Sequence, residues 1–357
     1  MLTVAFDNQT VLAERYGGVA RYFVELAAGL AKLPEVYPVF CAGLYRNCDL
    51  RTNRHRFETR GYWVPGVYRK LKMHKLSDAL CARQMRQLKP DIIHETNYSL
   101  NPPGLDIPAK RVLTVYDMIH EKFMPDSPTP ALKRAAIARA DWILCISETT
   151  RRDLLEYYPQ VASRTSVTYL AGPEPSGPLP RPRMLPEPYI LFVGNRAGYK
   201  NFAGLVRAYA QDRPLQQQVR LAVYGGKPWS AEEMAELVCS GISHRVTIVP
   251  DTQDRAALYQ HTEAFVFPSL YEGFGLPLLE AIAEGCPVVC SDTPCFREVM
   301  GESAAYFDPM DSVALASVVQ QTIACKNTPK PITKLSHRYA WADCSLGSLR
   351  VYKEMSS

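Results

Sequence analysis

Two glutamates stand eight positions apart in the stretch SLYEGFGLPLLEAIAEG, which runs from Ser269 to Gly285. Glu272 falls in a glycine-rich turn after a short apolar run. Pro277 is placed like the first residue of a helix, which puts Glu280 in the first helical turn. We expect neither carboxylate in the core. A carboxylate accepts hydrogen bonds from vicinal hydroxyls, such as those of a sugar or a ribose, although a first-turn glutamate also stabilises its helix through the dipole.

A second group of reactive residues follows the apolar run YILFV. Gly194 ends this run, Arg196 and Lys200 lie in the loop after it, and a helix is expected to begin near Asn201. A helix N-terminus, a planar guanidinium fork and a compact ammonium together favour a diphosphate. A surface loop with two solvated cations is the alternative. The loop is not a P-loop, and no expected strand leads into G-x-G-x-x-G, which disfavours a nicotinamide cofactor.

A pair of glycines, Gly17 and Gly18, lies between the apolar run LTVAF and an expected helix. Paired glycines permit a positive φ and a close approach of the backbone to a ligand. A plain loop would carry the same pair.

The cysteines are ten in number and have no paired framework, which fits a reducing compartment. Cys286, Cys290 and Cys295 do cluster. A metal site is one interpretation, but we favour buried thiols on a strand and on the loop after it, and we expect no metal.

The elements that must position these residues alternate between strands and helices on both sides of a proline-rich stretch. Residues 171–188 hold seven prolines and are predicted to be a linker. Expected strands are 2–6, 37–43, 91–95, 111–117, 142–147, 189–194, 219–226, 246–250, 264–269 and 287–292. Expected helices are 17–33, 130–140, 147–158, 201–210, 230–241, 254–261 and 277–285. The pattern predicts an α/β protein with two Rossmann-like domains, each a parallel sheet flanked by helices, facing each other across a cleft. Ligands of such sheets bind at the carboxyl ends of strands, where the residues above fall.

The overall composition favours a soluble two-domain protein. The chain has 357 residues, of which 47% are hydrophobic and 22% charged. Apolar stretches of 18 residues or more do not occur, and the N-terminus does not read as a signal peptide. We therefore expect a cytoplasmic location.

The net charge of +5 is concentrated in one segment, Tyr68–Lys89. Its cations are Arg69, Lys70, Lys72, Lys75, Arg83, Arg86 and Lys89, against Asp78 alone. Its apolar residues Leu71, Leu76, Leu80 and Met85 recur at near-helical spacing. The pattern predicts one or two amphipathic helices with a basic face, which is either a solvated face or a surface attracted to anionic lipid or a phosphate-bearing substrate. Nucleic acid is disfavoured because aromatic residues do not interleave with the cations.

The glutamate pair with its context, EGFGLPLLEAIAEGCPVVCSD, resembles the signature of glycosyltransferase family 4, the retaining nucleotide-sugar transferases with a GT-B fold. The resemblance covers nearly the whole chain. FDNQTVLAERYGGVARYFVEL, VYDMIHEKF, ADWILCISETTRRDL and FVGNRAGYKNF follow one another in the order typical of a bacterial branch. That branch commonly serves in lipopolysaccharide, O-antigen or capsule assembly, and its members are often called mannosyltransferases.

The resemblance implies a role for each candidate residue. The donor-binding residues would be Gly17, Gly18, Gly194, Arg196, Lys200, Glu272, Gly273, Phe274, Gly275, Leu276 and Glu280. Within this set, the glycine pair approaches the diphosphate, the two cations hold it, Glu272 contacts the donor sugar and Glu280 binds the ribose. Residues implied as catalytic are Glu272, Arg196, Lys200, His120 and Asp117. Many relatives carry His-Asp where this chain has Tyr116-Asp117. A structural role is the alternative for His120, and His94 is a further histidine for which a loop role is open.

The implied activity is that of a retaining, metal-independent hexosyltransferase without a cofactor. Its donor would be a nucleotide-diphosphate sugar, with GDP-mannose the first choice, and its acceptor a growing glycan or a lipid-linked sugar. The domains would be 1–170 for the acceptor, the linker 171–188, 189–335 for the nucleotide sugar, and a C-terminal helical segment, 336–357, that packs back on the first domain. Residues 68–89 would contact the inner face of the cytoplasmic membrane. Two alternatives are an epimerase or phosphorylase on a related scaffold and a non-catalytic sugar-nucleotide-binding protein.

Overall fold

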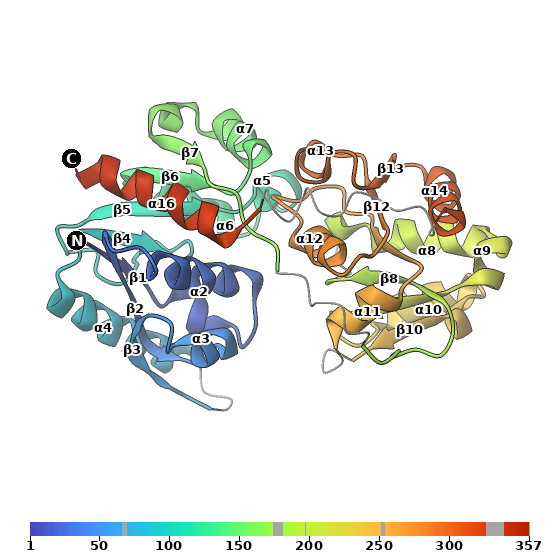
Figure 1. Ribbon diagram of the computed structural model, residues 1–357, viewed down its shortest axis with the longest axis horizontal. Coiled ribbons are helices and arrows are strands. Elements are labelled where there is room, and N and C mark those ends of the chain that lie inside the picture. The colour runs from blue at the N-terminus through green and yellow to red at the C-terminus, as the bar shows by residue number, and fades with distance from the viewer. Residues whose placement is uncertain (66–69, 174–180, 197, 251–253, 326–338, 357) are drawn as a thin grey trace. The chain divides into compact units, whose positions relative to one another are not determined.

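The computed structural model describes residues 1–65, 70–173, 181–196, 198–250, 254–325 and 339–356. The chain divides into two compact units (Figure 1). The first unit comprises Met1–Leu170 and Ala340–Ser357, and the second comprises Ala171–Tyr339. Residues 174–180 of the expected linker lie outside the described residues.

The first unit is built on a parallel sheet. Its strands are β1 (Leu2–Phe6), β2 (Val36–Tyr45), β3 (Glu58–Trp63), β4 (Ile92–Glu95), β5 (Lys110–Val115), β6 (Trp142–Cys145) and β7 (Thr165–Val167). Among the described residues the strand order is β3-β2-β1-β4-β5-β6-β7, and neighbouring strands run parallel.

Helices cover the first sheet. They are α1 (Gln9–Ala13), α2 (Gly18–Leu30), α3 (Cys48–Asn53), α4 (Lys70–Leu88), α5 (Ile119–Phe123), α6 (Thr129–Arg139), α7 (Glu148–Tyr157) and α16 (Trp341–Ser356). The expected N-cap of α7 is confirmed, because the Ser147 side chain accepts a hydrogen bond from the Thr150 N–H at 2.9 Å. The last helix, α16, lies beside α2 (Figure 1), so the end of the chain belongs to the first unit.

The second unit has its own parallel sheet. Its strands are β8 (Tyr189–Val193), β9 (Arg220–Tyr224), β10 (Val246–Val249), β11 (Ala264–Phe267), β12 (Val288–Ser291) and β13 (Ala305–Phe307). In the described residues their order is β10-β9-β8-β11-β12-β13, again with parallel neighbours. Its helices are α8 (Phe202–Gln211), α9 (Arg213–Gln218), α10 (Ala231–Cys239), α11 (Arg255–His261), α12 (Leu276–Ala283), α13 (Pro294–Met300) and α14 (Ser312–Ala324).

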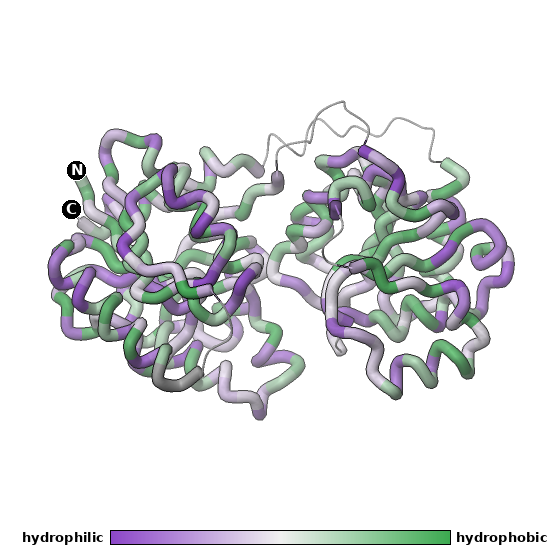
Figure 2. Tube along the Cα trace, turned by 90° about the horizontal axis from the view of Figure 1, so that it is seen from below, coloured by the Kyte–Doolittle hydropathy of each residue, from purple (hydrophilic) through white to green (hydrophobic). Residues whose placement is uncertain are grey.

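Both sheets are buried between helices, as the apolar strands require. The residues of β1, β4, β8 and β11 are mostly apolar and buried. Hydrophobic and hydrophilic stretches alternate along the trace of both units (Figure 2). A parallel sheet needs cover on both faces, and continuous apolar strands supply the core for it. The predicted α/β class, with two parallel sheets flanked by helices, is confirmed.

The strand order defines one switch point in each sheet. In the first sheet the connections run outwards from β1 on one side and from β4 on the other, and in the second sheet from β8 and β11. Ligands of open parallel sheets bind where the carboxyl ends of such strands diverge. We therefore expect ligands to bind at the loops after β1, β4, β8 and β11.

The basic segment forms the single helix α4, but its buried face differs from the expected one. Ser77, Cys81 and Met85 are buried, whereas Leu76 is 51% exposed. The helix packs on β2 through Ser77 and Cys81. Because Ser77 faces the strand, the neighbouring Leu76 lies at the surface. Lys75 and Arg83 are also exposed. Arg69 lies outside the described residues, as do the side chains of 70–72.

None of the helices in the described part of the chain has the length and apolar character needed to cross a membrane.

Candidate functional site

The loops after β8 and β11 meet at the switch point of the second sheet. The Nζ atom of Lys200 lies 2.5 Å from Oε1 of Glu272, and the two side chains are only 15% and 12% exposed. The Leu270 N–H donates to the Tyr199 carbonyl at 2.7 Å, which ties the two loop backbones together. Two of the residues singled out in the sequence are thus brought into direct contact.

Lys200 lies beside an apolar ring and just before a helix. Its ammonium is 5.2 Å from the ring centroid of Phe267 in β11. Asn201, at φ 52°, is the N-cap of α8, and its side chain donates to the Pro309 carbonyl at 2.9 Å. A half-buried cation near a helix N-terminus attracts anionic groups. This end of the sheet can therefore hold phosphate oxygens next to the Glu272 carboxylate.

Arg196 is engaged by a residue that the sequence did not single out. Its Nε donates to Glu233 Oε1 at 2.7 Å and its Nη2 to Glu233 Oε2 at 3.0 Å. The guanidinium lowers the pKa of the Glu233 carboxyl through this hydrogen bonding. The planar fork that we expected to face phosphate oxygens holds a carboxylate of α10 instead.

Glu280 corrects two expectations. Helix α12 begins at Leu276 with Pro277 second, so Glu280 lies beyond the first turn, and it is buried at 8% exposure. Its Oε1 lies 2.9 Å from Arg255 Nη2, and its Oε2 accepts a 3.4 Å hydrogen bond from the Tyr259 hydroxyl. The packing of α12 against α11 explains this burial, because both partners lie on α11.

The turn between the two glutamates is held by packing. Phe274 is buried, and its ring packs edge-on against that of Tyr339, with 5.4 Å between the ring centroids. Gly275 has φ 97°, and a Cβ there would lie 2.9 Å from Leu278. Gly273 is buried and Leu276 half-buried. This packing therefore holds the backbone of the turn that follows Glu272.

The glycines of the candidate site differ in backbone geometry. Gly194 has φ 129°, as a position without a side chain allows. Gly17 is extended at φ −171° and is the N-cap of α2, and Gly18 is not among the glycines with positive φ. Neither glycine of this pair uses the positive φ that glycine permits, because the chain enters α2 directly from an extended residue.

In the first unit, a buried lysine fixes the loop of Asp117. Lys133 is 1% exposed and donates to the Asp117 carbonyl oxygen at 2.8 Å and to Glu121 Oε2 at 2.7 Å. The Asp117 carboxylate accepts from the Ile119 N–H at 2.9 Å. His120 follows in α5 and is half-buried. Lys133 could not be identified from the sequence, since a lysine within a helix is usually solvated.

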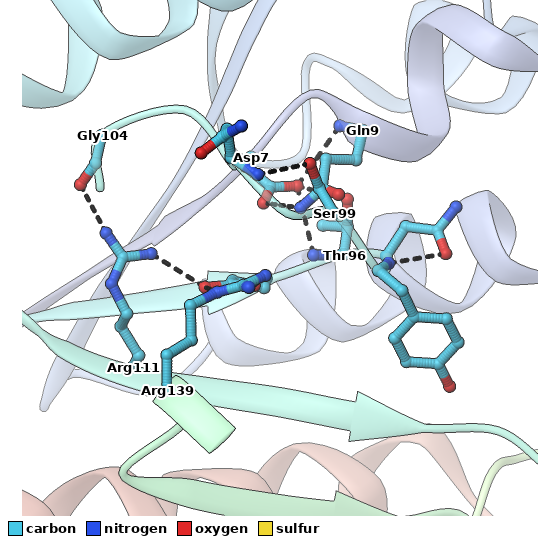
Figure 3. A network of polar contacts seen from close by, with 11 residues as sticks. Asp7, Gln9, Thr96, Ser99, Gly104, Arg111 and Arg139 are labelled. Carbon is cyan, nitrogen blue, oxygen red and sulfur yellow. Dashed lines mark hydrogen bonds and ion pairs between the residues drawn. The ribbon is translucent and has the colours of Figure 1, made fainter. Parts of the chain in front are cut away.

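A further acidic residue lies at the switch point of the first sheet. Asp7 directly follows β1 and is fully buried, and it accepts hydrogen bonds from Thr96 N, Thr96 Oγ1 and Gln9 Nε2 at 3.1, 2.5 and 2.6 Å (Figure 3). Burial raises the pKa of Asp7 to about 6. Asp7 was not among the predicted site residues, although its place directly after an apolar strand is a signal in the sequence.

The neighbouring charges of β4 are structural. Glu95 is 2% exposed, and its carboxylate binds Arg111 Nη1 at 2.8 Å and Arg139 Nη2 at 2.6 Å (Figure 3). These contacts join β4 to β5 and α6. His94 lies within β4 rather than after it, between Tyr352 at 2.7 Å and Thr114 at 2.8 Å, and burial lowers its pKa to about 3. A loop role for His94 is thus excluded.

The cysteine cluster is made of buried thiols. Cys286, Cys290 and Cys295 are buried and form no disulfide bond. Cys295 belongs to α13 rather than to a loop, which corrects the expected placement. Within the described residues, we find no group of three histidine, cysteine or acidic side chains arranged to hold a metal ion.

A cavity of about 1000 Å³ lies elsewhere in the first unit. Its lining includes Arg86, Asp106, Lys110 and Asp141, next to the amino ends of β5 and β6. The charges pair among themselves, Arg86 with Asp106 at 3.1 Å and Lys110 with Asp141 at 3.7 Å. Because ligands of parallel sheets bind at the opposite strand ends, we assign no chemistry to this cavity.

Comparison with known families finds a match in each unit. A model described as Glycosyltransferase Family 4 matches residues 16–171, and one described as Glycosyl transferases group 1 matches residues 187–324. The O-antigen chain mannosyltransferase B of Escherichia coli is 27% identical and aligns over 94% of this chain and 96% of its own length. A serotype-specific mannosyltransferase, WbdA of Escherichia coli, is 28% identical over 73% of this chain and 36% of that longer protein.

Among solved structures, the sucrose-phosphate synthase of Thermosynechococcus elongatus superposes with a TM-score of 0.74. The alignment covers 99% of each chain at 20% identity. At this identity the likeness concerns the fold, and it confirms the GT-B architecture predicted from the sequence.

Proposed function

This chain belongs to glycosyltransferase family 4 and is a glycosyltransferase, and we propose that it transfers a hexose from a nucleotide-diphosphate sugar with retention of the anomeric configuration. The acceptor is a growing glycan or lipid-linked sugar of lipopolysaccharide, O-antigen or capsule assembly. Mannose from GDP-mannose is the first choice of donor, since the relative aligned along nearly the full chain is an O-antigen mannosyltransferase.

The observation that carries this proposal is the contact of Lys200 with Glu272 at the carboxyl ends of β8 and β11. A nucleotide sugar presents a diphosphate directly bonded to C1 of its sugar. A cation and a carboxylate that touch each other suit these two groups, because the cation binds the phosphate oxygens and the carboxylate accepts hydrogen bonds from the sugar hydroxyls.

The residues of the second unit have separate roles in the proposed transfer. As the bond from C1 to the phosphate oxygen breaks, negative charge builds on the diphosphate, where Lys200, Arg196 and the N-terminus of α8 stabilise it. Glu272 orients the sugar, and Glu280 binds the nucleotide ribose. The departing phosphate takes the proton of the acceptor hydroxyl as the new bond forms on the same face of the sugar. None of these roles requires a metal ion or a cofactor.

The first unit supplies the acceptor side of the proposed reaction. Asp117 and His120 are the candidates for contact with the acceptor, and Lys133 holds their loop. Gly17 and Gly18 approach the diphosphate at the start of α2. The exposed cations of α4 attach the enzyme to the inner face of the cytoplasmic membrane, where lipid-linked acceptors reside.

A transfer assay tests the proposal. The full chain is screened with nucleotide sugars by thermal shift, and the best binder is then assayed with lipid-linked acceptors in buffer containing EDTA. We expect an acceptor that gains one hexose, with the anomeric configuration of the donor as determined by NMR. Isomerised donor, phosphate-dependent cleavage, or donor binding without turnover across the acceptor panel would each replace this function with one of its alternatives.

A further inference from the structure

The Arg196 guanidinium is almost completely occupied by its own protein. The side chain is 5% exposed, and Nε and Nη2 bind the Glu233 carboxylate. Nη2 also donates to the Lys227 carbonyl at 2.7 Å. The guanidinium lies over the Trp229 ring, 4.4 Å from its centroid, and Trp229 in turn stacks on Phe202 of α8. Two of the three nitrogens and one face are thus fixed.

The third nitrogen, Nη1, is buried and has no hydrogen-bond partner in the described part of the chain. It faces the glycines that end β8 and β9. A Cβ on Gly226 would lie 2.8 Å from Nη1 and 3.5 Å from the Gly194 carbonyl oxygen. A buried guanidinium nitrogen without an acceptor is costly, and an oxygen atom of a ligand would supply the missing acceptor.

We propose that Glu233 is a positioning residue for the donor: it turns Arg196 so that Nη1 is offered to a diphosphate oxygen at the glycines after β8 and β9. This inference rests on the proposed function, in which Arg196 serves the donor diphosphate. It replaces the expected two-pronged contact of the guanidinium with an end-on contact through one nitrogen.

Glu233 is itself held in place by the start of its helix. It forms a capping box with Ser230, in which the Ser230 N–H donates to Glu233 Oε2 at 2.8 Å and the Glu233 N–H donates to the Ser230 hydroxyl at 3.2 Å. Because Arg196 lowers the pKa of Glu233, the carboxylate stays ionised near neutral pH. The carboxylate is therefore a fixed and charged support.

The ion pair predicts that Glu233 affects the reaction rate without strengthening the binding of the nucleotide. Glu233 cancels much of the Arg196 charge, so it does not strengthen the binding of an anion. What it supplies is direction, and direction matters most when charge develops on the leaving diphosphate. Removing the carboxylate should slow the reaction and leave nucleotide affinity unchanged or tighter.

The test compares Glu233→Gln with Glu232→Gln. Glutamine still serves a capping box, and Glu232 is an exposed carboxylate at the same helix end. Affinity for GDP and UDP is measured by calorimetry. The reaction rate is measured as hydrolysis of the nucleotide sugar. In this reaction water bonds to C1 of the sugar, and the nucleoside diphosphate is released.

We expect the Glu233→Gln rate to fall about tenfold, with nucleotide affinity equal to or above wild type and an unchanged thermal midpoint. Glu232→Gln should match the wild type throughout. A wild-type rate in Glu233→Gln would overturn the inference, as would a rate loss matched by a loss of affinity. If the wild-type chain itself binds neither nucleotide and releases none, the proposed function fails and the inference fails with it.

A second pair of variants checks the space beside Nη1. Gly226→Ala would place a methyl group against this nitrogen, whereas Gly241 has a similar φ of 71° with open space around its Cβ position. Both positions have a positive φ, so both variants carry backbone strain. Only Gly226→Ala should lower the affinity for GDP or UDP, and equal affinity in the two variants would contradict the proposed place of the diphosphate.

Discussion

A lysine and a glutamate that are 72 positions apart in the chain lie 2.5 Å from each other at the second switch point. Lys200 directly precedes the N-cap of α8, and Glu272 directly precedes the buried turn around Phe274. In the proposed enzyme this fixed pair recognises the bond that breaks, with the cation on its phosphate side and the carboxylate on its sugar side.

At the residue scale, Lys200→Ala should weaken binding of GDP or UDP by about 10- to 100-fold. A hydrogen bond from a charged group contributes roughly 1.5–3 kcal/mol, which corresponds to that factor. Calorimetric titration of the full chain measures it. Arg213→Ala removes an exposed cation from α9 and should bind as the wild type does. Equal affinities in the two variants would take Lys200 out of the site.

At the element scale, a buried contact joins the last helix to the sheet of the first unit. Tyr352 of α16 lies 2.7 Å from His94 of β4, and both residues are fully buried. The second ring nitrogen of His94 lies 2.8 Å from Thr114. Two neighbouring strands and a helix from the far end of the chain are thereby joined by one imidazole.

Tyr352→Phe should lower the free energy of unfolding by about 1–3 kcal/mol, because it leaves a buried ring nitrogen without a partner. Urea unfolding followed by circular dichroism measures the change. Tyr157→Phe removes a hydroxyl from an exposed side chain of α7 and is the matched control. A loss no larger than that of the control would show that α16 does not depend on His94.

The strands could be predicted where they are buried and apolar, and were missed where they are not. The residues of β3 are mostly half-exposed because it is the edge strand, and β7 and β13 are three residues each. The same limit applies to the site. Lys200 and Glu272 could be found because they follow buried strands. The partners Glu233 and Arg255 could not, since only the fold brings α10 to Arg196 and α11 to Glu280.

At the scale of the whole molecule, the chain passes between its two units twice, near residue 170 and again near residue 340. In the second unit Lys200 and Glu272 lie at the switch point of the sheet, and in the first unit Asp117 and His120 follow β5. The cations of α4 lie on the first unit, which is the unit proposed to receive the acceptor. The proposal therefore assigns membrane contact and acceptor binding to the same unit, and it predicts transfer at a membrane surface.

Binding to anionic vesicles should depend on α4. Neutralising Lys75, Arg83 and Lys89 to glutamine should reduce co-sedimentation by more than about tenfold, since each cation near an anionic surface contributes about 1 kcal/mol. Raising the salt concentration should weaken the wild-type binding as well. Three exposed arginines elsewhere, Arg152, Arg207 and Arg213, provide a control of equal charge. Equal sedimentation of both variants would make α4 a solvated face.

The most direct test of the whole account is a measurement of kcat and donor KM for sugar transfer by the wild type, Glu272→Ala and Glu280→Ala. If Glu272 orients the reacting sugar, its removal lowers kcat by about 100-fold or more. If Glu280 binds only the ribose, its removal mainly raises donor KM. Small and equal effects of the two substitutions, or a wild-type kcat in Glu272→Ala, would contradict the assignment of this site to glycosyl transfer.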